Sequence, residues 1–330
     1  MKKIAVIGSN SFSGSDFIDH VLDERDYKVL AISRSPEKGE LFLPYKINPE
    51  RRRVIFHQMD LNKDMERLKG LLAEERPAYI VNFAAQSEVA PSWRNPEQWF
   101  QTNAASLAAL INFLKDQKWL ERYLHISSPE VYGTCSGVVR EDAPLNPSTP
   151  YAASKAAGDL LLFTYVKNFG FPLVMIRSTN VYGAYQQLFK IIPRSVIYIK
   201  LGRKIELHGG GRAVKSYIHI RDISRGELAA LEQGRPGAIY HLSPEAGIAV
   251  RDVVRIICEV MGRSLDQATS MVEERLGQDA AYVIDSTSAR QEFQWASQVG
   301  FEQGLTGVVK WVEKYWDAIQ KESLEYQHQP

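Results

Sequence analysis

Tyr151 and Lys155 carry the clearest chemical signal in the sequence, because they stand four residues apart at the start of a predicted helix over 151–169. This spacing places the phenol and the ammonium on one face of the helix. A free tyrosine has a pKa of about 10, too high for a base near neutral pH, but a neighbouring ammonium favours the phenolate. Surface pairs with this spacing are common, so the interpretation depends on the residues that accompany the pair.

Ser128 and Glu130 are those residues, and they follow a predicted strand over 122–127. Open α/β sheets bind their ligands at the carboxyl ends of the strands. There, Ser128 can hydrogen-bond a ligand hydroxyl beside Tyr151, and Glu130 adds a carboxylate. The four side chains together predict proton transfer at this edge of the sheet.

The N-terminal segment GSNSFSG predicts a dinucleotide site, because it joins a predicted strand over 3–7 to a predicted helix over 13–23. Gly8 permits a tight turn, Gly14 permits close packing, and backbone N–H groups at the helix start can face a pyrophosphate. Ser11 stands where such a motif usually has its middle glycine, so its side chain points away or the diphosphate sits further out. A plain turn is the alternative. The contacts expected here are Gly8, Ser11, Phe12 and Gly14.

The next predicted strand, over 27–33, ends without the carboxylate that folds preferring NAD place on the ribose. The chain has Ser33, Arg34 and Ser35 instead, and an arginine flanked by hydroxyls suits a 2′-phosphate. This favours NADP over NAD and leaves both open. A solvated loop arginine is the alternative interpretation.

Two further strand ends complete the expected cofactor site. Asp60 and Leu61 end a strand over 54–59, where a carboxylate can accept a hydrogen bond from an adenine amino group. Ala84 and Ala85 end a strand over 79–83, where small side chains let the backbone approach the cofactor.

Strands and helices alternate through the first half of the chain, and the strands are almost entirely apolar. This pattern predicts a parallel sheet covered by helices on both faces. The other predicted elements are a strand over 173–177, a strand over 217–220, and helices over 65–75, 102–117, 250–261 and 305–322.

The composition excludes several classes of protein. The chain has 330 residues, 45% of them hydrophobic and 24% charged, which is typical of a folded globular protein. A net charge of +1 favours neither nucleic acid nor an anionic membrane, and no apolar run is long enough to span a bilayer. Cys135 and Cys258 form no metal-binding spacing. The N-terminus is expected to be a first strand rather than a signal peptide, and the protein a cytoplasmic one without metal.

With these motifs in view, the sequence resembles the extended short-chain dehydrogenase/reductase family, and within it the nucleotide-sugar 4,6-dehydratases. The segment AAQSEVAPS over 84–92 resembles GDP-mannose 4,6-dehydratases, notably at Gln86, although Glu88 stands where that family usually has histidine. The segments RSTNVYG over 177–183 and FKIIP over 189–193 are closer to dTDP-glucose 4,6-dehydratases.

The resemblance implies a Rossmann-type doubly wound parallel sheet with a smaller interleaved C-terminal substrate lobe. The sheet domain is expected over 1–183 plus 217–242, and the sugar-nucleotide lobe over 184–216 plus 243–330. It also implies a homodimer formed through the helices 102–117 and 151–169, for which burial against the chain's own lobe is the alternative. The expected contacts to a nucleotide-diphosphate sugar are Ser87, Asn103, Asn180, Lys190 and Lys215, although Asn103, Asn180 and Lys190 also fit ordinary structural roles.

The reaction implied is the NAD(P)-dependent formation of a 4-keto-6-deoxy sugar. Tyr151 takes the proton of the C4 hydroxyl during oxidation, Lys155 stabilises the phenolate and binds the ribose, and Ser128 aligns the hydroxyl. Glu130 removes the C5 proton, the C6 hydroxyl leaves as water, hydride returns to C6, and C5 is reprotonated.

The sequence departs from the family at the acid and at the diphosphate contacts. Pro129 stands where the dTDP-glucose enzymes have their aspartic acid, so Glu130 or a water must protonate the departing hydroxyl. Lys215 stands where the family has an arginine, and Ala280 or Ala281 stands in place of another.

Three other functions stay open. A nucleotide-sugar 4-epimerase needs Tyr151 and Lys155 but no carboxylate at position 130. A nucleotide-glucuronate decarboxylase also forms a 4-keto intermediate and can carry a Ser-Glu pair. A cofactor-binding regulatory protein of the same fold needs no proton-transfer group at all.

Overall fold

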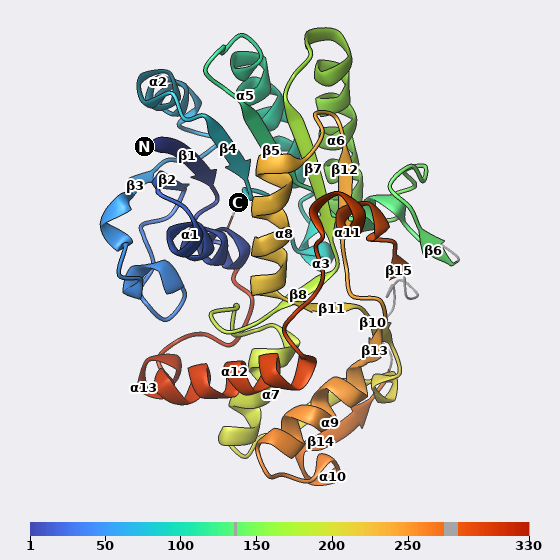
Figure 1. The fold of residues 1–330 in the computed structure, drawn as a ribbon. Coiled ribbons are helices and arrows are strands. Elements are labelled where there is room, and N and C mark those ends of the chain that lie inside the picture. Colours follow the sequence, from blue (N-terminus) through green and yellow to red (C-terminus); the bar gives the residue numbers. More distant parts are fainter. Residues whose placement is uncertain (135–136, 274–282, 330) are drawn as a thin grey trace.

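A seven-stranded parallel sheet forms the centre of the computed structural model, which describes residues 1–134, 137–273 and 283–329 (Figure 1). The strand order is β12-β7-β5-β4-β1-β2-β3. The winding reverses between β1 and β4, which is where open α/β sheets bind ligands. The strands are β1 (Lys2–Ile7), β2 (Tyr27–Ser33), β3 (Val54–Gln58), β4 (Tyr79–Asn82), β5 (Arg122–Ile126), β7 (Leu173–Ser178) and β12 (Ile239–Leu242).

Helices cover both faces of this sheet, so the predicted doubly wound architecture is confirmed. Successive residues of β1 point to opposite faces, so Ile4 and Val6 pack with one helical layer while Ala5 and Ile7 pack with the other. The first layer contains α1 (Phe12–Glu24) and α8 (Ile220–Gln233), and the second contains α2 (Met65–Glu75), α5 (Leu107–Leu114) and α6 (Pro150–Phe169). Burial on both faces is the reason that the strands are almost entirely apolar.

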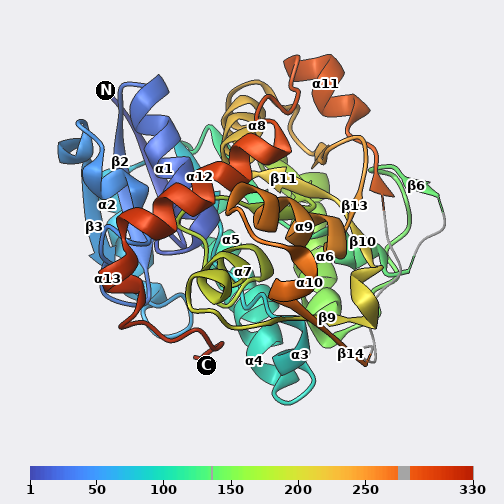
Figure 2. The ribbon, with the colours of Figure 1, turned by 90° about the horizontal axis from the view of Figure 1, so that it is seen from below.

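A smaller group of helices with its own apolar core lies beyond the carboxyl ends of the strands, in front of the sheet in Figure 2. It consists of α7 (Ile191–Lys200), α9 (Val250–Val260), α10 (Leu265–Ala268), α12 (Phe301–Lys314) and α13 (Trp316–Ile319). Short strand pairs border it: β9 (Ile205–His208) with β14 (Thr269–Val272), β10 (Val214–Lys215) with β13 (Ile248–Ala249), and β8 (Asn180–Tyr182) with β11 (Tyr217–His219). The exact division into two lobes stays a prediction.

Helix α11 (Thr287–Phe293) and strands β6 (Val138–Val139) and β15 (Val283–Ile284) lie outside these groups. Helix α11 packs against α8 and β12, and Trp295 after it joins the core of the sheet. Strands β6 and β15 pair at the edge of the molecule. No helix in the three described ranges is both long and apolar enough to cross a bilayer.

The predicted helix over 102–117 has a more complex form. Helix α4 (Pro96–Phe100) leads into a π-helical turn, Gln101–Ser106, and this turn leads into α5. Gly158 of α6 approaches this turn so closely that an added Cβ would lie 2.6 Å from the carbonyl oxygen of Asn103. The short helix α3 (Val89–Ser92) packs beside it on α6. These contacts join the helix that carries Tyr151 to the segment that follows β4.

Candidate active site

Tyr151 lies in the first turn of α6, where capping fixes its position. The side chain of Thr149 accepts a hydrogen bond of 3.1 Å from the backbone N–H of Ala152, and Pro150 occupies the first helical position. Tyr151 is buried at the carboxyl edge of the sheet, and its backbone N–H donates to the hydroxyl of Ser92. The cap therefore fixes both the start of the helix and the position of the phenol.

Ser128 and Glu130 both affect the pKa of the Tyr151 phenol. Ser128 caps a 3-10 turn, Pro129–Tyr132, and its hydroxyl accepts a hydrogen bond of 3.2 Å from the N–H of Glu130. Burial raises the pKa of Tyr151 well above its usual range, the charge of Glu130 raises this pKa further, and a hydrogen bond with Ser128 lowers it. The protein alone thus keeps the phenol protonated, so forming the phenolate requires added positive charge nearby.

Lys155 lies one helical turn beyond Tyr151 and is 3% exposed. Its Nζ donates to the carbonyl of Ile126 at 2.8 Å and lies 3.5 Å from Nε2 of His125. Burial lowers the pKa of Lys155 to about 8, although the carboxylate of Asp159 opposes the shift. A lysine near its pKa at neutral pH can exchange its proton readily with a neighbouring group.

A buried ion pair between Asp159 and Arg177 lies next to Lys155. Asp159 lies one turn further along α6, and its carboxylate accepts hydrogen bonds from Arg177 at 2.8 Å and from Ser127 at 2.6 Å. All three side chains are buried. Asp159, Ser127 and His125 were not among the predicted site residues, although the spacing of four from Lys155 to Asp159 was a usable signal.

The loop between β1 and α1 forms a cradle for a dinucleotide. Gly8 has a positive φ of 93°, and an added Cβ would lie 2.7 Å from the backbone nitrogen of Ala84. At Gly14 an added Cβ would lie 2.6 Å from the carbonyl oxygen of Gly8. Ser11 caps α1, with its hydroxyl accepting from the N–H of Gly14 at 3.0 Å. The serine therefore turns toward the helix, and the loop fits a pyrophosphate at the N-terminus of α1.

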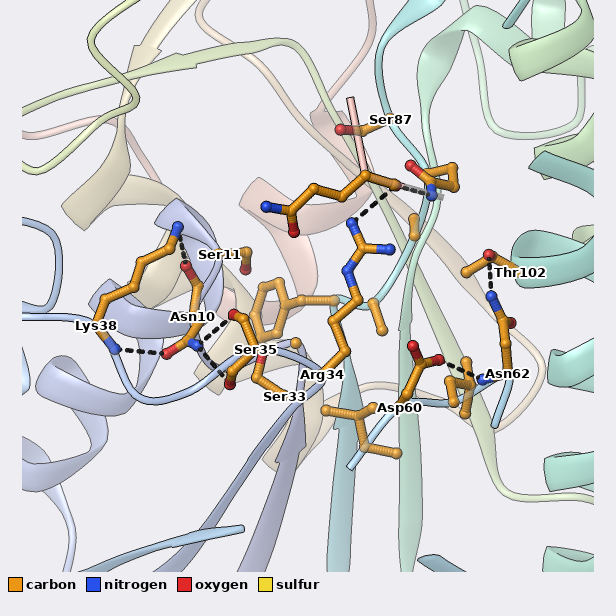
Figure 3. Close-up of a pocket in the computed structure, with 18 of the residues that line it drawn as sticks. Asn10, Ser11, Ser33, Arg34, Ser35, Lys38, Asp60, Asn62, Ser87 and Thr102 are labelled. Carbon is orange, nitrogen blue, oxygen red and sulfur yellow. Dashed lines mark hydrogen bonds between the residues drawn. The ribbon is translucent and has the colours of Figure 1, made fainter. Parts of the chain in front are cut away.

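A cavity of about 400 Å³ extends from this loop across the ends of β2, β3 and β4 (Figure 3). Within it, one carboxylate oxygen of Asp60 accepts from the N–H of Asn62 at 2.7 Å, and the Asn62 amide donates to Thr102. The predicted cofactor residues that line the cavity are Gly8, Ser11, Ser33, Arg34, Asp60, Leu61, Ala84 and Ala85.

Asn10 and Lys38 also line this cavity and were not predicted. The Asn10 amide donates to the hydroxyl of Ser35 at 2.9 Å, and the Nζ of Lys38 donates to the carbonyl of Asn10 at 3.3 Å. Desolvation lowers the pKa of Lys38, and the charge of Arg34 also lowers it. Two cations therefore lie near the end of β2, where a carboxylate would select NAD.

A second cavity, of about 370 Å³, lies in front of Tyr151 and shares Ser11 and Ser87 with the first. Asn180 and Lys190 line it, as does Phe12, which was predicted to contact the cofactor. The ammonium of Lys190 pairs with Glu88 at 2.7 Å. The two cavities adjoin at the residues that a cofactor and a second ligand would share.

The structure places two predicted residues away from the two cavities. Asn103 donates from its amide to the carbonyl of Gln86 and to the hydroxyl of Ser154, so both of its N–H groups are used inside the protein. It therefore positions the segment after β4, which fits the ordinary structural role, and it lines neither of the two cavities. Lys215 lies in β10 and lines neither of the two cavities. Ala280, Ala281 and Cys135 lie outside the described residues.

Comparison with known proteins matches the chain to a known family. The family model for GDP-mannose 4,6 dehydratase matches residues 6–308. The dTDP-glucose 4,6-dehydratase of Mycobacterium tuberculosis is 30% identical over 336 residues, which cover 99% of this chain and 98% of the relative.

Two solved structures have the same fold. DesIV, a dTDP-glucose 4,6-dehydratase from Streptomyces venezuelae with NAD and the ligand TYD bound, superposes with a TM-score of 0.85 at 30% identity, covering 96% of this chain and 98% of that one. A UDP-glucose 4-epimerase from Thermotoga maritima superposes with a TM-score of 0.86 at 23% identity, covering 95% of this chain and 99% of that one, and it supports the fold alone. The family match and the dehydratase relatives place the chain among the nucleotide-sugar 4,6-dehydratases of the extended short-chain dehydrogenase/reductase family.

Proposed function

We propose that this enzyme converts a nucleotide-diphosphate hexose to the 4-keto-6-deoxy sugar with the side chains of Ser128, Glu130, Tyr151 and Lys155. The observation that carries the assignment is the convergence of Glu130 and Ser128 on the buried phenol of Tyr151. An alcohol oxidation needs a base at the hydroxyl, and an elimination needs a second base at the neighbouring carbon. The site supplies both groups at one edge of the sheet.

Tyr151 acts first, as the base for the C4 hydroxyl. Its phenol is buried and protonated in the protein alone, so the positive charge of an oxidised nicotinamide would have to join that of Lys155 to favour the phenolate. Ser128, which already hydrogen-bonds the phenol, holds the sugar hydroxyl in line with it. A bound nicotinamide supplies the hydride acceptor for C4 and later the hydride donor for C6.

Glu130 acts second, on the C5 proton that the 4-ketone has made acidic. Pro129 has no proton to give, so Glu130, once protonated, passes its proton to the departing C6 hydroxyl, directly or through a water. Its backbone N–H is held by Ser128, which keeps the carboxylate on the same side of the site as Tyr151.

Two alternative reactions are distinguished from the dehydration by Glu130 and by the product. In an epimerase, Glu130 would be a bystander, although its charge raises the pKa of the Tyr151 phenol. A glucuronate decarboxylase can carry the same Ser-Glu pair, so the mass of the product must separate it from a dehydratase.

The cofactor is proposed to be NADP rather than NAD. The related solved dehydratase structure contains NAD. In this chain, however, Arg34, Lys38 and the hydroxyl of Ser35 surround the position after β2, and all three suit a 2′-phosphate. A homodimer is proposed through α5 and α6, because Leu160 and Phe169 of α6 are 59% and 56% exposed.

The direct test is mass spectrometry of the products formed from GDP-, dTDP-, UDP- and CDP-linked hexoses and from UDP-glucuronic acid. Loss of water from one of the hexoses supports the proposal. Loss of carbon dioxide identifies a decarboxylase, and an isomer of unchanged mass identifies an epimerase.

A further inference from the structure

Residues 322–329, which we name the C-terminal strap, follow α13 and return to the central sheet. In Figure 1 the C-terminal end lies against the carboxyl ends of β1 and β4. Three of its residues, Tyr326, Gln327 and Gln329, line the cavity assigned to the cofactor. The strap is therefore a wall of that cavity that comes from the opposite end of the chain.

The strap connects two sides of the cleft through one atom. The carbonyl oxygen of Gln329 accepts a hydrogen bond of 3.1 Å from Arg34 and another of 2.8 Å from the amide of Gln86. Arg34 follows β2, on the adenosine side of the cleft, and Gln86 follows β4, on the side of Tyr151. A segment that bridges these two side chains spans the ends of β1 and β4 that lie between them.

Aromatic contacts hold the strap in this position. The ring of His328 stacks on Trp99 with a centroid distance of 5.2 Å and an interplanar angle of 9°, and its Nε2 lies 2.6 Å from Oε1 of Gln98. The ring of Tyr326 meets Phe189 edge to face at 5.4 Å. Such ring pairs stabilise a structure by more than the burial of their apolar area alone, so they hold the strap in one position.

The strap lines the cleft without filling it. The cavity of about 400 Å³ remains beneath it, bordered by Gly8, Asp60 and Ala84 as well as by the strap. This volume falls in the range of ligand-binding pockets. The charge of Glu322, at the start of the strap, raises the pKa of Lys38 and so favours the cationic form of a side chain lining the same cavity.

We propose that the C-terminal strap is part of the cofactor site and keeps the dinucleotide on the enzyme throughout the reaction. The inference rests on the proposed function, in which hydride leaves C4 and returns to C6, so the same cofactor must stay bound between the two transfers. A covered cleft meets that requirement, because the strap must open before the cofactor can leave.

The test compares cofactor release from five full-length proteins, the wild type among them, and one shortened chain. The variants are Tyr326→Ala, His328→Ala, the double variant, and a chain that ends at Ser323. The matched control is Glu325→Gln, because Glu325 is an exposed residue of the strap that does not line the cofactor cavity. Each protein is loaded with NAD or NADP, and the dissociation rate is measured by rapid dilution without any sugar present.

The double variant and the shortened chain should release cofactor about tenfold faster or more, while Glu325→Gln matches the wild type, since most affinity differences between related complexes appear in the dissociation rate. With a confirmed substrate, the shortened chain should also lose reduced cofactor and 4-keto sugar to solution, and excess cofactor should restore turnover. Unchanged release rates would overturn the proposal. Slower release or tighter binding in the shortened chain would also overturn it, because the strap would then compete with the cofactor. These rates are measured without substrate, so they stay informative even if the dehydration is not observed.

Discussion

The carboxylate of Asp159 accepts a hydrogen bond of 2.8 Å from the guanidinium of Arg177, and neither side chain is more than 1% exposed. Lys155 lies one helical turn away from Asp159, with its ammonium on the carbonyl of Ile126. The lysine is therefore held in place by the end of β5, while the carboxylate of Asp159 raises its pKa and the guanidinium of Arg177 lowers it.

Asp159→Asn should destabilise the protein by about 3–5 kcal/mol, because it leaves the guanidinium of Arg177 buried without a counter-charge. The measurement is urea unfolding at neutral pH, followed by circular dichroism. Glu259→Gln is the control, since the pair of Glu259 with Arg255 on α9 is exposed and should contribute little. Equal stabilities for the two variants would contradict this account of the ion pair.

Lys155→Met should change how stability depends on pH. In the folded protein, burial lowers the pKa of Lys155 from 10.5 to about 8, so between these two values the unfolded chain binds more protons than the folded one. The contribution of Lys155 to the free energy of unfolding therefore rises with pH across this window, by roughly 3 kcal/mol in total. The methionine variant lacks this contribution.

Unfolding measured at pH 7, 8.5 and 10 tests this point, with the wild type and the variant compared at each pH. The free energy of unfolding of the variant, relative to that of the wild type, should be highest at pH 7 and should fall steadily toward pH 10. A difference in stability that stays constant over the range would mean that the pKa of Lys155 is not lowered.

Much of the fold was predictable from the sequence, because apolar strands and amphipathic helices alternate regularly in the first half. The strand predicted over 27–33 and the helix predicted over 65–75 match β2 and α2 residue for residue. Helix α7 was missed, because its core is made of β-branched residues that also suit a strand. The short strands β9 and β14 pair across 60 residues of chain, and nothing local in their sequence indicates such a partner.

The site was predictable wherever a motif carried it and not where the tertiary fold created it. The spacing of Tyr151 and Lys155 on one helix is visible in the sequence, as is the glycine turn after β1. The approach of Gln329 to Arg34 joins residues 295 positions apart, and no pattern predicts it. Asn103 is predicted to contact the substrate, but a sequence cannot reveal that its amide donates hydrogen bonds to Gln86 and Ser154.

Arg34→Ala should lower the ratio of NADP affinity to NAD affinity by about tenfold or more, because a charge-assisted contact to the 2′-phosphate is lost. The ratio is the quantity to measure, since the contact of Arg34 with Gln329 affects both cofactors alike. Arg52→Ala is the control, because Arg52 is an exposed arginine of the turn before β3. If purified protein releases only NAD and the ratio is unchanged in Arg34→Ala, NADP is not the cofactor.

Leu160→Glu should convert a dimer to a monomer, because it places a charge on the exposed apolar face of α6. Light scattering at micromolar concentration reports the mass. Leu201→Glu is the matched control, since Leu201 is 40% exposed but lies after α7, away from the proposed interface. A wild-type protein that is monomeric under these conditions would contradict the proposed assembly.

The most direct test of the mechanism is the behaviour of Glu130→Gln on a confirmed substrate, followed by absorbance of reduced cofactor and by exchange of the C5 hydrogen with deuterium oxide. Oxidation at C4 needs Tyr151 but not Glu130, so reduced cofactor should accumulate on the enzyme while C5 exchange nearly stops. Net turnover should fall by about 100-fold or more. Tyr151→Phe is the comparison, and it should accumulate neither reduced cofactor nor ketone. Near-normal product formation by Glu130→Gln would contradict the assignment of Glu130 as the C5 base.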